Sequence, residues 1–311
     1  SVAGLFRLTP MRYDIRLTLH YDYGAGAGAG RHHVRVLPKE IAGVQHVEAA
    51  SLSFSPQPGE RTDFTDFFGP TVAAIAFREP HDTLDVKMSA RVSATRPAPG
   101  IDLSPDLATL RCEVAETLSL SPQSPQHFLA GRLHTQIVPR LTAYAEQSSG
   151  AGSVLTIARD ICARIHRDFA YDGDATSVST RAAEAFDLKR GVCQDFAHVM
   201  IAGLRGLGVP AGYVSGFLRT IAPPGKARLE GADAMHAWVN VWCGRQMGWV
   251  ELDPTNDMPA GDDHIVVGYG RDYADVAPIV GVFRTSGGQE GDQKVDVVPV
   301  EDGVPAAVAG K

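Results

Sequence analysis

The sequence predicts an α+β protein, with an antiparallel, sandwich-like β domain at the N-terminus and a core of mixed helices and strands after it. Three observations support this fold class. Short apolar runs separated by Gly, Pro and Asp fill residues 11–96, a proline-rich segment follows, and helical patterns and then further strands occupy the rest. Short strands with turn signals between them are typical of a sandwich, and runs of helices and strands in this order are typical of α+β domains.

The first expected strand shows the alternation of strand residues clearly. In the segment that begins at residue 11, apolar side chains recur at every second position, with polar side chains between them. This period of two places Tyr13, Ile15, Leu17 and Leu19 on one face of a strand. Further runs of this kind are "HHVRVLP", "ASLSFSP", "TVAAIAF" and "LDVKMSARVSA". The repeat "GAGAGAG" at residues 24–30 predicts a flexible hairpin loop between the first two strands.

The proline-rich segment "TRPAPGIDLSPDL" marks a boundary. We therefore expect a β domain over residues 1–96, a linker over 97–125 and a catalytic domain over 126–311. Apolar residues at spacings of three and four predict a helix over 154–169, with Cys162 on its apolar face, and another from Cys193 to the Gly stop near residue 206. Strands are expected in "AGYVSGFL", "HAWVNVWC" and "WVELD".

Composition excludes several classes of function. The 311 residues carry a net charge of −7 and show no basic stripe, so we expect no nucleic-acid partner. No apolar run approaches the roughly 20 residues of a membrane span, and the N-terminal residues show no signal-peptide pattern. The cysteines Cys112, Cys162, Cys193 and Cys243 form no closely spaced pair. This spacing favours reduced thiols in a cytoplasmic setting and gives no reason to expect a metal site.

The stretch "GVCQDFAHVM" places Cys193 in the first turn of an expected helix. Two interpretations are open for such a residue. A buried cysteine is an ordinary core side chain, whereas a cysteine at a helix N-terminus can be an activated nucleophile because the helix dipole favours the thiolate. These ten residues alone do not separate the two.

A nucleophilic cysteine needs a base and a group that orients the base. The segment "MHAWVNVWCGRQMGWVELDPTND" supplies His236 and Asp253. If the two strands form a hairpin with a four-residue loop at 243–246, Trp242 pairs with Met247, and His236 lies directly opposite Asp253 on the same face. This interpretation depends on the strand register, because a slip of one residue would turn the two side chains to opposite faces.

These motifs resemble those of the transglutaminase-like superfamily of papain-type thiol enzymes. The matching stretches are "RGVCQDFAHVMIAGLRGLGVPAGYVSGF", "HAWVNVW" and "WVELDPTN", in that order. "DFFGPTVAAIAFREPHDTLDV" and "VGYGRDYADVAPIVGVFR" are similar to the N-terminal and C-terminal parts of the bacterial type with an N-terminal β domain. The resemblance implies a papain-like core in which Cys193 is the nucleophile, His236 the base and Asp253 the orienting acid.

The activity implied is attack on an amide through a Cys193 thioester, without a cofactor or a metal. We favour hydrolysis of a peptide, protein or small amide, because water is always present and no amine site is recognisable. The alternatives are transfer of the acyl group to an amine, as in transglutaminases, and a binding module that has lost activity. Cys112, Cys162 and Cys243 are expected to be dispensable for the chemistry.

Six further residues are candidates for the site. Tyr171 is a candidate oxyanion donor, beside the backbone N–H of Cys193, or a packing residue. Gln194, together with Asp195, is placed to line the cleft or to cap the helix, and Trp238 to shield the His236–Asp253 pair or to fill the core. Asp272 and Tyr273, in the family-like "GRDYAD", are candidates for lining the cleft.

Overall fold

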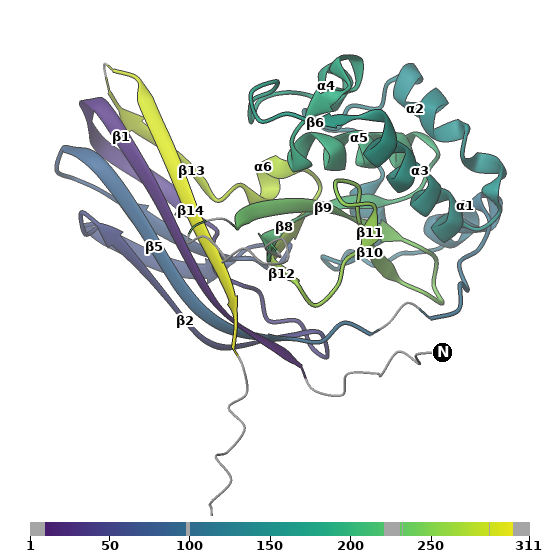
Figure 1. The fold of residues 1–311 in the computed structure, drawn as a ribbon, viewed down its shortest axis with the longest axis horizontal. Helices are drawn as coiled ribbons and strands as arrows, with labels where there is room; N and C mark the ends of the chain where they lie inside the picture. Colours follow the sequence, from purple (N-terminus) through teal and green to yellow (C-terminus); the bar gives the residue numbers. More distant parts are fainter. Residues whose placement is uncertain (1–9, 98–99, 221–230, 232, 286, 301–311) are drawn as a thin grey trace, which may run out of the picture.

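The computed structural model describes residues 10–97, 100–220, 231, 233–285 and 287–300. A β-rich part lies beside a part in which helices cover a second sheet (Figure 1). The α+β class and the sandwich-like N-terminal domain are therefore confirmed.

The β-rich part consists of β1 (Met11–Val34), β2 (Gln45–Ser55), β3 (Glu60–Thr65), β4 (Thr71–Ala76), β5 (His81–Ala94), β13 (Ile279–Arg284) and β14 (Gln289–Pro299). The helical segments are α1 (Leu107–Ala115), η1 (Pro125–Phe128), α2 (Pro139–Glu146), η2 (Ser149–Ala151), α3 (Val154–Asp168), α4 (Ala182–Leu188), α5 (Cys193–Gly206) and α6 (Tyr273–Val276). The remaining strands are β6 (Ala170–Tyr171), β7 (Arg190–Gly191), β8 (Ala211–Leu218), β9 (Ala234–Trp242), β10 (Trp249–Asp253), β11 (Met258–Pro259) and β12 (His264–Gly270).

Strand β1 belongs to two sheets. Its first half pairs with β5 and β14, and its last residues pair with β4 and β13. The predicted apolar face is buried, since Tyr13, Ile15, Leu17 and Leu19 are each at most 3% exposed. The expectation of a hairpin loop at residues 24–30 is wrong, because this segment continues β1. The pairing with β5 is irregular between Asp22 and Ala27, where glycines allow a strand to bend from one sheet into the other.

The last described strands return to the first. Strands β13 and β14 follow the helical part in the chain, yet both pair with β1 (Figure 1). Within the range expected as a linker, α1 buries Leu110 and Val114 in the helical core. The boundaries at residues 96 and 126 stay a prediction.

Helix α5 lies in the middle of the second part. It packs against α2, α4 and β9, and Phe196, Met200 and Ile201 are at most 2% exposed. The neighbouring antiparallel sheet has the strand order β11-β10-β9-β8-β12. A helix that is buried along most of its length holds its first residue at a defined place relative to this sheet.

Candidate functional site

Cys193 is the first residue of α5 and is half-buried. The helix start is held by Asp195, whose carboxylate accepts hydrogen bonds from the Val192 N–H (2.8 Å) and the Thr176 hydroxyl (2.6 Å). Gly191 has a φ of 155°, and a Cβ there would overlap the Asp195 carboxylate. A glycine and a buried acid therefore shape the backbone before Cys193. As at any helix start, the first N–H groups have no partner within the helix.

His236 and Asp253 lie together, but in a different strand register from the one predicted. Trp242 pairs with Trp249 rather than with Met247, so the connection is two residues longer than expected. A slip of two residues keeps every side chain on its face, because strand side chains alternate with period two. His236 and Asp253 are therefore diagonal neighbours, and His236 Nε2 lies 2.8 Å from Asp253 Oδ2.

The carboxylate of Asp253 is fully buried and accepts five hydrogen bonds. Oδ2 receives them from His236 Nε2 at 2.8 Å, His264 Nε2 at 3.1 Å and Asn256 Nδ2 at 2.7 Å. Oδ1 receives them from the backbone N–H groups of Thr255 at 2.9 Å and Asn256 at 3.2 Å. A buried carboxylate with this many donors stays ionised and holds its position.

His264 was not expected from the sequence. It lies at the start of β12 and is 1% exposed. Its Nδ1 accepts a hydrogen bond from the Gly261 N–H at 3.1 Å, so the ring proton is on Nε2, which donates to Asp253. The only sequence signal for this residue was its position at the beginning of an apolar run, which does not distinguish it from the other ten histidines.

The electrostatics favour a charged pair. Burial opposes protonation of His236, but hydrogen bonds with Asp253 and Cys193 outweigh it and raise the pKa of His236 to about 10. Burial also opposes ionisation of Asp253, yet the hydrogen bonds from His236 and His264 hold the pKa of Asp253 well below its usual range. Because Nε2 of His236 is bonded to Asp253, Nδ1 is the nitrogen left for the Cys193 thiol.

The side chains of His236, Asp253 and His264 also meet the distance requirement for a metal site, since their ligand atoms lie within 4.8 Å of one another. Their mutual hydrogen bonds account for this closeness, and the His264 proton on Nε2 opposes metal ligation at that atom. That the site works without a metal or a cofactor stays a prediction.

Tyr171 and Gln194 flank Cys193. Tyr171 pairs with Gly191 across β6 and β7 and is 63% exposed, and partial burial and the nearby Cys193 raise its pKa. Its ring contacts Phe196 edge-on, with centroids 6.4 Å apart. Gln194 is buried, and its Nε2 donates to the Val178 carbonyl at 3.1 Å. Tyr171 is thus accessible beside the thiol, whereas Gln194 ties a neighbouring loop to the helix start.

Trp238 is fully buried beside the histidines. Its ring stacks on His236 with centroids 6.0 Å apart and meets the edge of His264 at 5.2 Å. Its Nε1 donates to Glu251 Oε2 at 2.6 Å. The indole therefore excludes water from one side of the two imidazoles.

Asp272 and Tyr273 differ in their surroundings. Asp272 is fully buried, accepts the Ala274 N–H at the start of α6 and pairs with Arg132 at 3.2 Å. Tyr273 lines a cavity of about 320 Å³ between α6 and the β-rich part. The other lining residues include Tyr21, Tyr23, Val178 and Phe283. Because the Val178 carbonyl binds Gln194, the cavity adjoins the residue that follows Cys193.

The other cysteines differ from Cys193 in their surroundings, and Cys162 lies near enough to Asp253 to feel its charge. Cys162 and Cys243 are buried, and burial raises the pKa of each thiol to about 12. Cys112 is exposed on α1. Among the cysteines that the structure describes, Cys193 is the one whose side chain interacts with an imidazole, that of His236.

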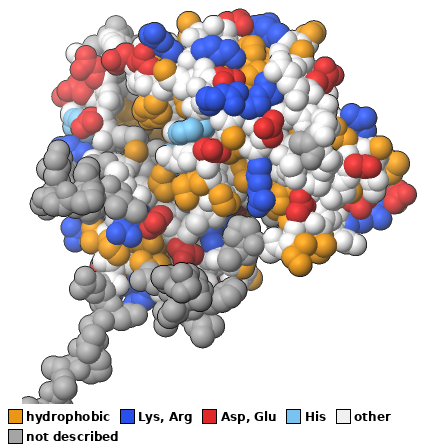
Figure 2. Space-filling view, turned by 45° about the vertical axis from the view of Figure 1, so that its right-hand side comes forward, with side chains coloured by type: hydrophobic (Ala, Val, Ile, Leu, Met, Phe, Trp, Pro, Cys, Tyr) orange, Lys and Arg blue, Asp and Glu red, His pale blue; other side chains and the backbone are white. Residues whose placement is uncertain are grey.

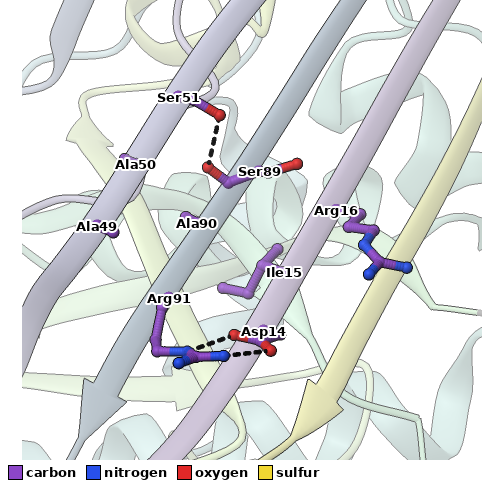
Figure 3. Close-up of a pocket in the computed structure, with 9 residues that line it drawn as sticks. All are labelled: Asp14, Ile15, Arg16, Ala49, Ala50, Ser51, Ser89, Ala90 and Arg91. Carbon is purple, nitrogen blue, oxygen red and sulfur yellow. Dashed lines mark hydrogen bonds and ion pairs between the residues drawn. The ribbon is translucent and has the colours of Figure 1, made fainter.

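A hollow of about 430 Å³ on the outer face of the sandwich is a separate feature (Figure 3). Small side chains of β2 and β5, such as Ala49 and Ala50, form its floor, and Arg91 makes a two-point ion pair with Asp14 at its edge. None of the candidate site residues lines it. Acidic and basic side chains are interspersed over the face of the molecule in Figure 2.

The fold, with a cysteine at a helix start and a histidine and an aspartate on strands of the adjoining sheet, defines a papain-like architecture. The chain belongs to the transglutaminase-like superfamily. The family model for the transglutaminase-like superfamily matches residues 142–254, and the model for the bacterial transglutaminase-like N-terminal region matches residues 13–93.

Relatives span nearly the whole chain. An uncharacterized protein of Mycobacterium tuberculosis is 37% identical over 298 residues, which cover 94% of this chain and 91% of the relative. A protein-glutamine gamma-glutamyltransferase of Pseudomonas aeruginosa is 33% identical over 93 residues, 29% of this chain and 14% of that protein. The solved structure of a candidate cysteine protease from Cytophaga hutchinsonii has the same fold, with a TM-score of 0.70, 21% identity, and coverage of 94% and 91% of the two chains. Among the described residues, no helix is both long and apolar enough to cross a membrane.

Proposed function

We propose that the protein is a cysteine-dependent amide hydrolase with the triad Cys193, His236 and Asp253. The observation that carries this proposal is the position of His236, which interacts with the thiol on one side and with a buried carboxylate on the other. This is the arrangement that nucleophilic catalysis requires: a nucleophile, a base within reach and a group that orients the base.

In the proposed reaction, the Cys193 thiolate attacks the amide carbonyl while the His236 imidazolium holds the proton that the thiol has lost. The tetrahedral oxyanion accepts hydrogen bonds from the backbone N–H of Cys193 and, as a candidate, from the Tyr171 hydroxyl. The imidazolium then protonates the departing amine, which leaves a thioester. His236 next removes a proton from a water molecule that attacks the thioester, and the acid and Cys193 are released.

Acyl transfer shares the first half of this reaction and remains the alternative activity. The glutamyltransferase of Pseudomonas aeruginosa, similar over 93 residues, favours it. The two activities differ only in whether water or an amine resolves the thioester. A catalytically inactive binding module is a third possibility. The presence of all three side chains, with His236 2.8 Å from Asp253, argues against that module.

The substrate proposed is a peptide, protein or small amide whose side chain enters the cavity at Tyr273. The aromatic and aliphatic lining of that cavity suits an apolar side chain. Gln194 and Trp238 support the site from behind, and Asp272 holds α6, which carries Tyr273. We place the reaction in a reducing compartment, the cytoplasm, because the four cysteines are free.

A thioester-trapping experiment tests the proposal. The protein is mixed with aryl amides of apolar N-acyl amino acids and quenched in acid, and intact mass spectrometry then measures the acyl adduct. We expect an adduct on Cys193 in the wild type and none in Cys193→Ala, with Cys112→Ala as the matched control that retains it. Adding methylamine separates the two activities, because transfer gives an N-methylamide in proportion to the amine, whereas hydrolysis gives the acid.

A further inference from the structure

The cavity of about 320 Å³ beside Tyr273 is built by both parts of the molecule. Tyr21 and Tyr23 come from β1 and Phe283 comes from β13, whereas Tyr273 is the first residue of α6. Helix α6 lies on the side of the helical part that faces the β-rich part (Figure 1). The β-rich part therefore supplies one wall of a cavity whose other wall belongs to the part that holds Cys193.

Tyr213 of β8 connects this cavity to the thiol. Its ring meets the ring of Tyr273 at nearly a right angle, with centroids 6.3 Å apart. Burial raises the pKa of Tyr213, and the nearby Cys193 and Tyr273 raise it further. Because Cys193 acts on the charge of Tyr213, the two side chains are near each other. A substrate bound at the thiol can thus place a neighbouring side chain in the cavity.

The walls of this cavity are aromatic and uncharged. The ring of Phe283 packs on Tyr23 with centroids 4.9 Å apart and on His32 with centroids 6.0 Å apart. Burial lowers the pKa of His32, so its ring is neutral near neutral pH. None of the described residues that line the cavity is a lysine, an arginine, an aspartate or a glutamate. Because a buried charge without a partner is costly, this lining favours an uncharged group with an apolar body.

Two hydroxyl groups in the lining are unpaired and accessible. Tyr21 and Tyr273 are both partly buried. Neither hydroxyl makes a hydrogen bond with the residues that the structure describes, and neither belongs to the polar atoms that are both unpaired and closed to solvent. A ligand in the cavity can therefore reach both hydroxyls.

The two hydroxyls are also near each other and protonated. Burial raises the pKa of Tyr21, and Tyr273 and Tyr23 raise it further, because ionised phenols would repel one another. Burial likewise raises the pKa of Tyr273. Both groups keep their protons at neutral pH, so each can donate one hydrogen bond and accept another.

We propose that this cavity receives a tyrosine side chain of the substrate, and that the hydroxyls of Tyr21 and Tyr273 recognise its phenol oxygen. The substrate ring packs against Tyr23 and Phe283, and its hydroxyl accepts a hydrogen bond from one of the two tyrosines and donates to the other. A phenylalanine side chain would fill the same space but leave both hydroxyls without a partner. The inference rests on the proposed function, since it names the class of amide that the hydrolase selects: one next to a tyrosine.

Other groups that accept hydrogen bonds fit this cavity less well. A carboxylate would accept from both hydroxyls, but none of the described lining residues supplies a cation to compensate its charge. A carboxamide is uncharged, but it presents no ring face to Tyr23 and Phe283. A tyrosine side chain combines an aromatic body with a polar group at its far end.

The test measures binding rather than turnover, so it does not depend on hydrolysis. The full chain with Cys193→Ala is titrated with N-acetyl-tyrosine amide and with N-acetyl-phenylalanine amide, and saturation-transfer NMR of the ligand gives the dissociation constants. We expect the tyrosine compound to bind about 5- to 10-fold more tightly, because only its hydroxyl pairs with the two tyrosines. N-acetyl-glutamine amide, which has no ring, should bind more weakly than both. Equal affinity of the tyrosine and phenylalanine compounds, or no binding of either, would overturn the proposal.

Two matched variants locate the recognition. Tyr21→Phe and Tyr273→Phe, each made in the Cys193→Ala chain, keep the ring and remove one hydroxyl. Each should bring the affinity for the tyrosine compound close to that for the phenylalanine compound, which should itself be nearly unchanged. Tyr144→Phe is the control, because the Tyr144 hydroxyl bonds Asp168 at 3.0 Å outside the cavity, and it should keep the preference. A preference that survives both Tyr21→Phe and Tyr273→Phe would overturn the proposal.

Turnover by the wild type separates this inference from the proposed function. If anilides of acetyl-tyrosine and acetyl-phenylalanine are cleaved with equal kcat/KM, the hydrolysis stands and the tyrosine preference fails. If neither anilide is cleaved while the binding preference is present and is lost in Tyr21→Phe, the cavity is confirmed as a tyrosine site and the proposed hydrolysis fails.

Discussion

Two histidines bond the same oxygen of the Asp253 carboxylate, and they differ in what binds their second nitrogen. His236 and His264 both bond Oδ2 through Nε2, at 2.8 and 3.1 Å. The Nδ1 of His264 is bound by a backbone N–H, that of Gly261, whereas His236 interacts with the Cys193 thiol. One imidazole is therefore held in place at both nitrogens, and the other is placed to exchange a proton with a thiol.

This difference shows how one carboxylate can serve two purposes. A donor whose second nitrogen is fixed by the backbone holds Asp253 in place at all stages of a reaction. The donor whose second nitrogen faces the thiol also bonds Asp253 when neutral, but its bond is charge-assisted only while the ring is protonated. Substitutions of the two histidines should accordingly have effects of different size and kind.

The largest expected effect is the loss of the thiol itself. Cys193→Ala should abolish formation of a covalent acyl intermediate, because no other described cysteine lies beside an imidazole. Intact mass spectrometry after reaction with an aryl amide measures this. Cys243→Ala is a control for the loss of a thiol, although it leaves a small cavity in the core. An acyl adduct in Cys193→Ala would refute the assignment.

Asp253→Asn should lower the acylation rate about 10- to 100-fold, because a charge-assisted hydrogen bond of about 1.5–3 kcal/mol to the imidazolium is lost. The substitution keeps the size of the side chain, removes its negative charge and replaces one acceptor oxygen by an amide donor. The measurement is the rate of Cys193 alkylation against pH in wild type and variant. If the two profiles coincide, Asp253 has only a structural role at the end of β10, and the catalytic site consists of Cys193 and His236 alone.

The raised pKa of His236 predicts a pH-dependent contribution to stability. The group is protonated more readily in the folded protein, with a pKa of about 10, than in the unfolded chain, where it is about 6.5. Its contribution is therefore fully present below pH 6.5 and is lost as the pH rises towards 10. Urea unfolding of wild type and His236→Ala should show a difference that shrinks across this range. A constant difference would mean that His236 is neutral in the folded protein.

Substitution of His264 should affect acylation of Cys193 less than substitution of Asp253 does. His264→Ala should slow acylation about 10-fold, because one donor to a charged group is lost. His264→Gln should restore most of the rate, since its amide can donate to Asp253 and accept from the Gly261 N–H. The readout is the pH profile of Cys193 alkylation, which a purely structural defect would leave unmoved. Equal profiles in wild type and His264→Ala would contradict a positioning role.

The smallest effect is expected in the cavity beside the thiol. Tyr273→Leu should raise KM for substrates with an aromatic side chain about 2- to 10-fold and leave kcat nearly constant, because ring contacts contribute about 0.5–1.5 kcal/mol. Tyr144→Leu, at an aromatic residue elsewhere in the core, serves as a control for lost packing. A change in kcat alone would place Tyr273 in the chemistry rather than in substrate binding.

The sequence by itself predicted the α+β order, the buried face of β1 and the positions of Cys193, His236 and Asp253. These features depend on local patterns: a period of two for strands, a period near 3.6 for helices, and chemically distinct residues at the ends of elements. Even the wrong hairpin register left His236 and Asp253 on one face, because the error was two residues and parity was preserved.

Only the tertiary structure decided which distant groups meet. His264 reaches Asp253 because β12 joins the sheet through β8, and nothing near residue 264 in the sequence indicates that pairing. The return of β13 and β14 to β1 arises in the same way. Periodicity reports which face of an element is buried, but the partner across a sheet or between domains depends on long-range packing.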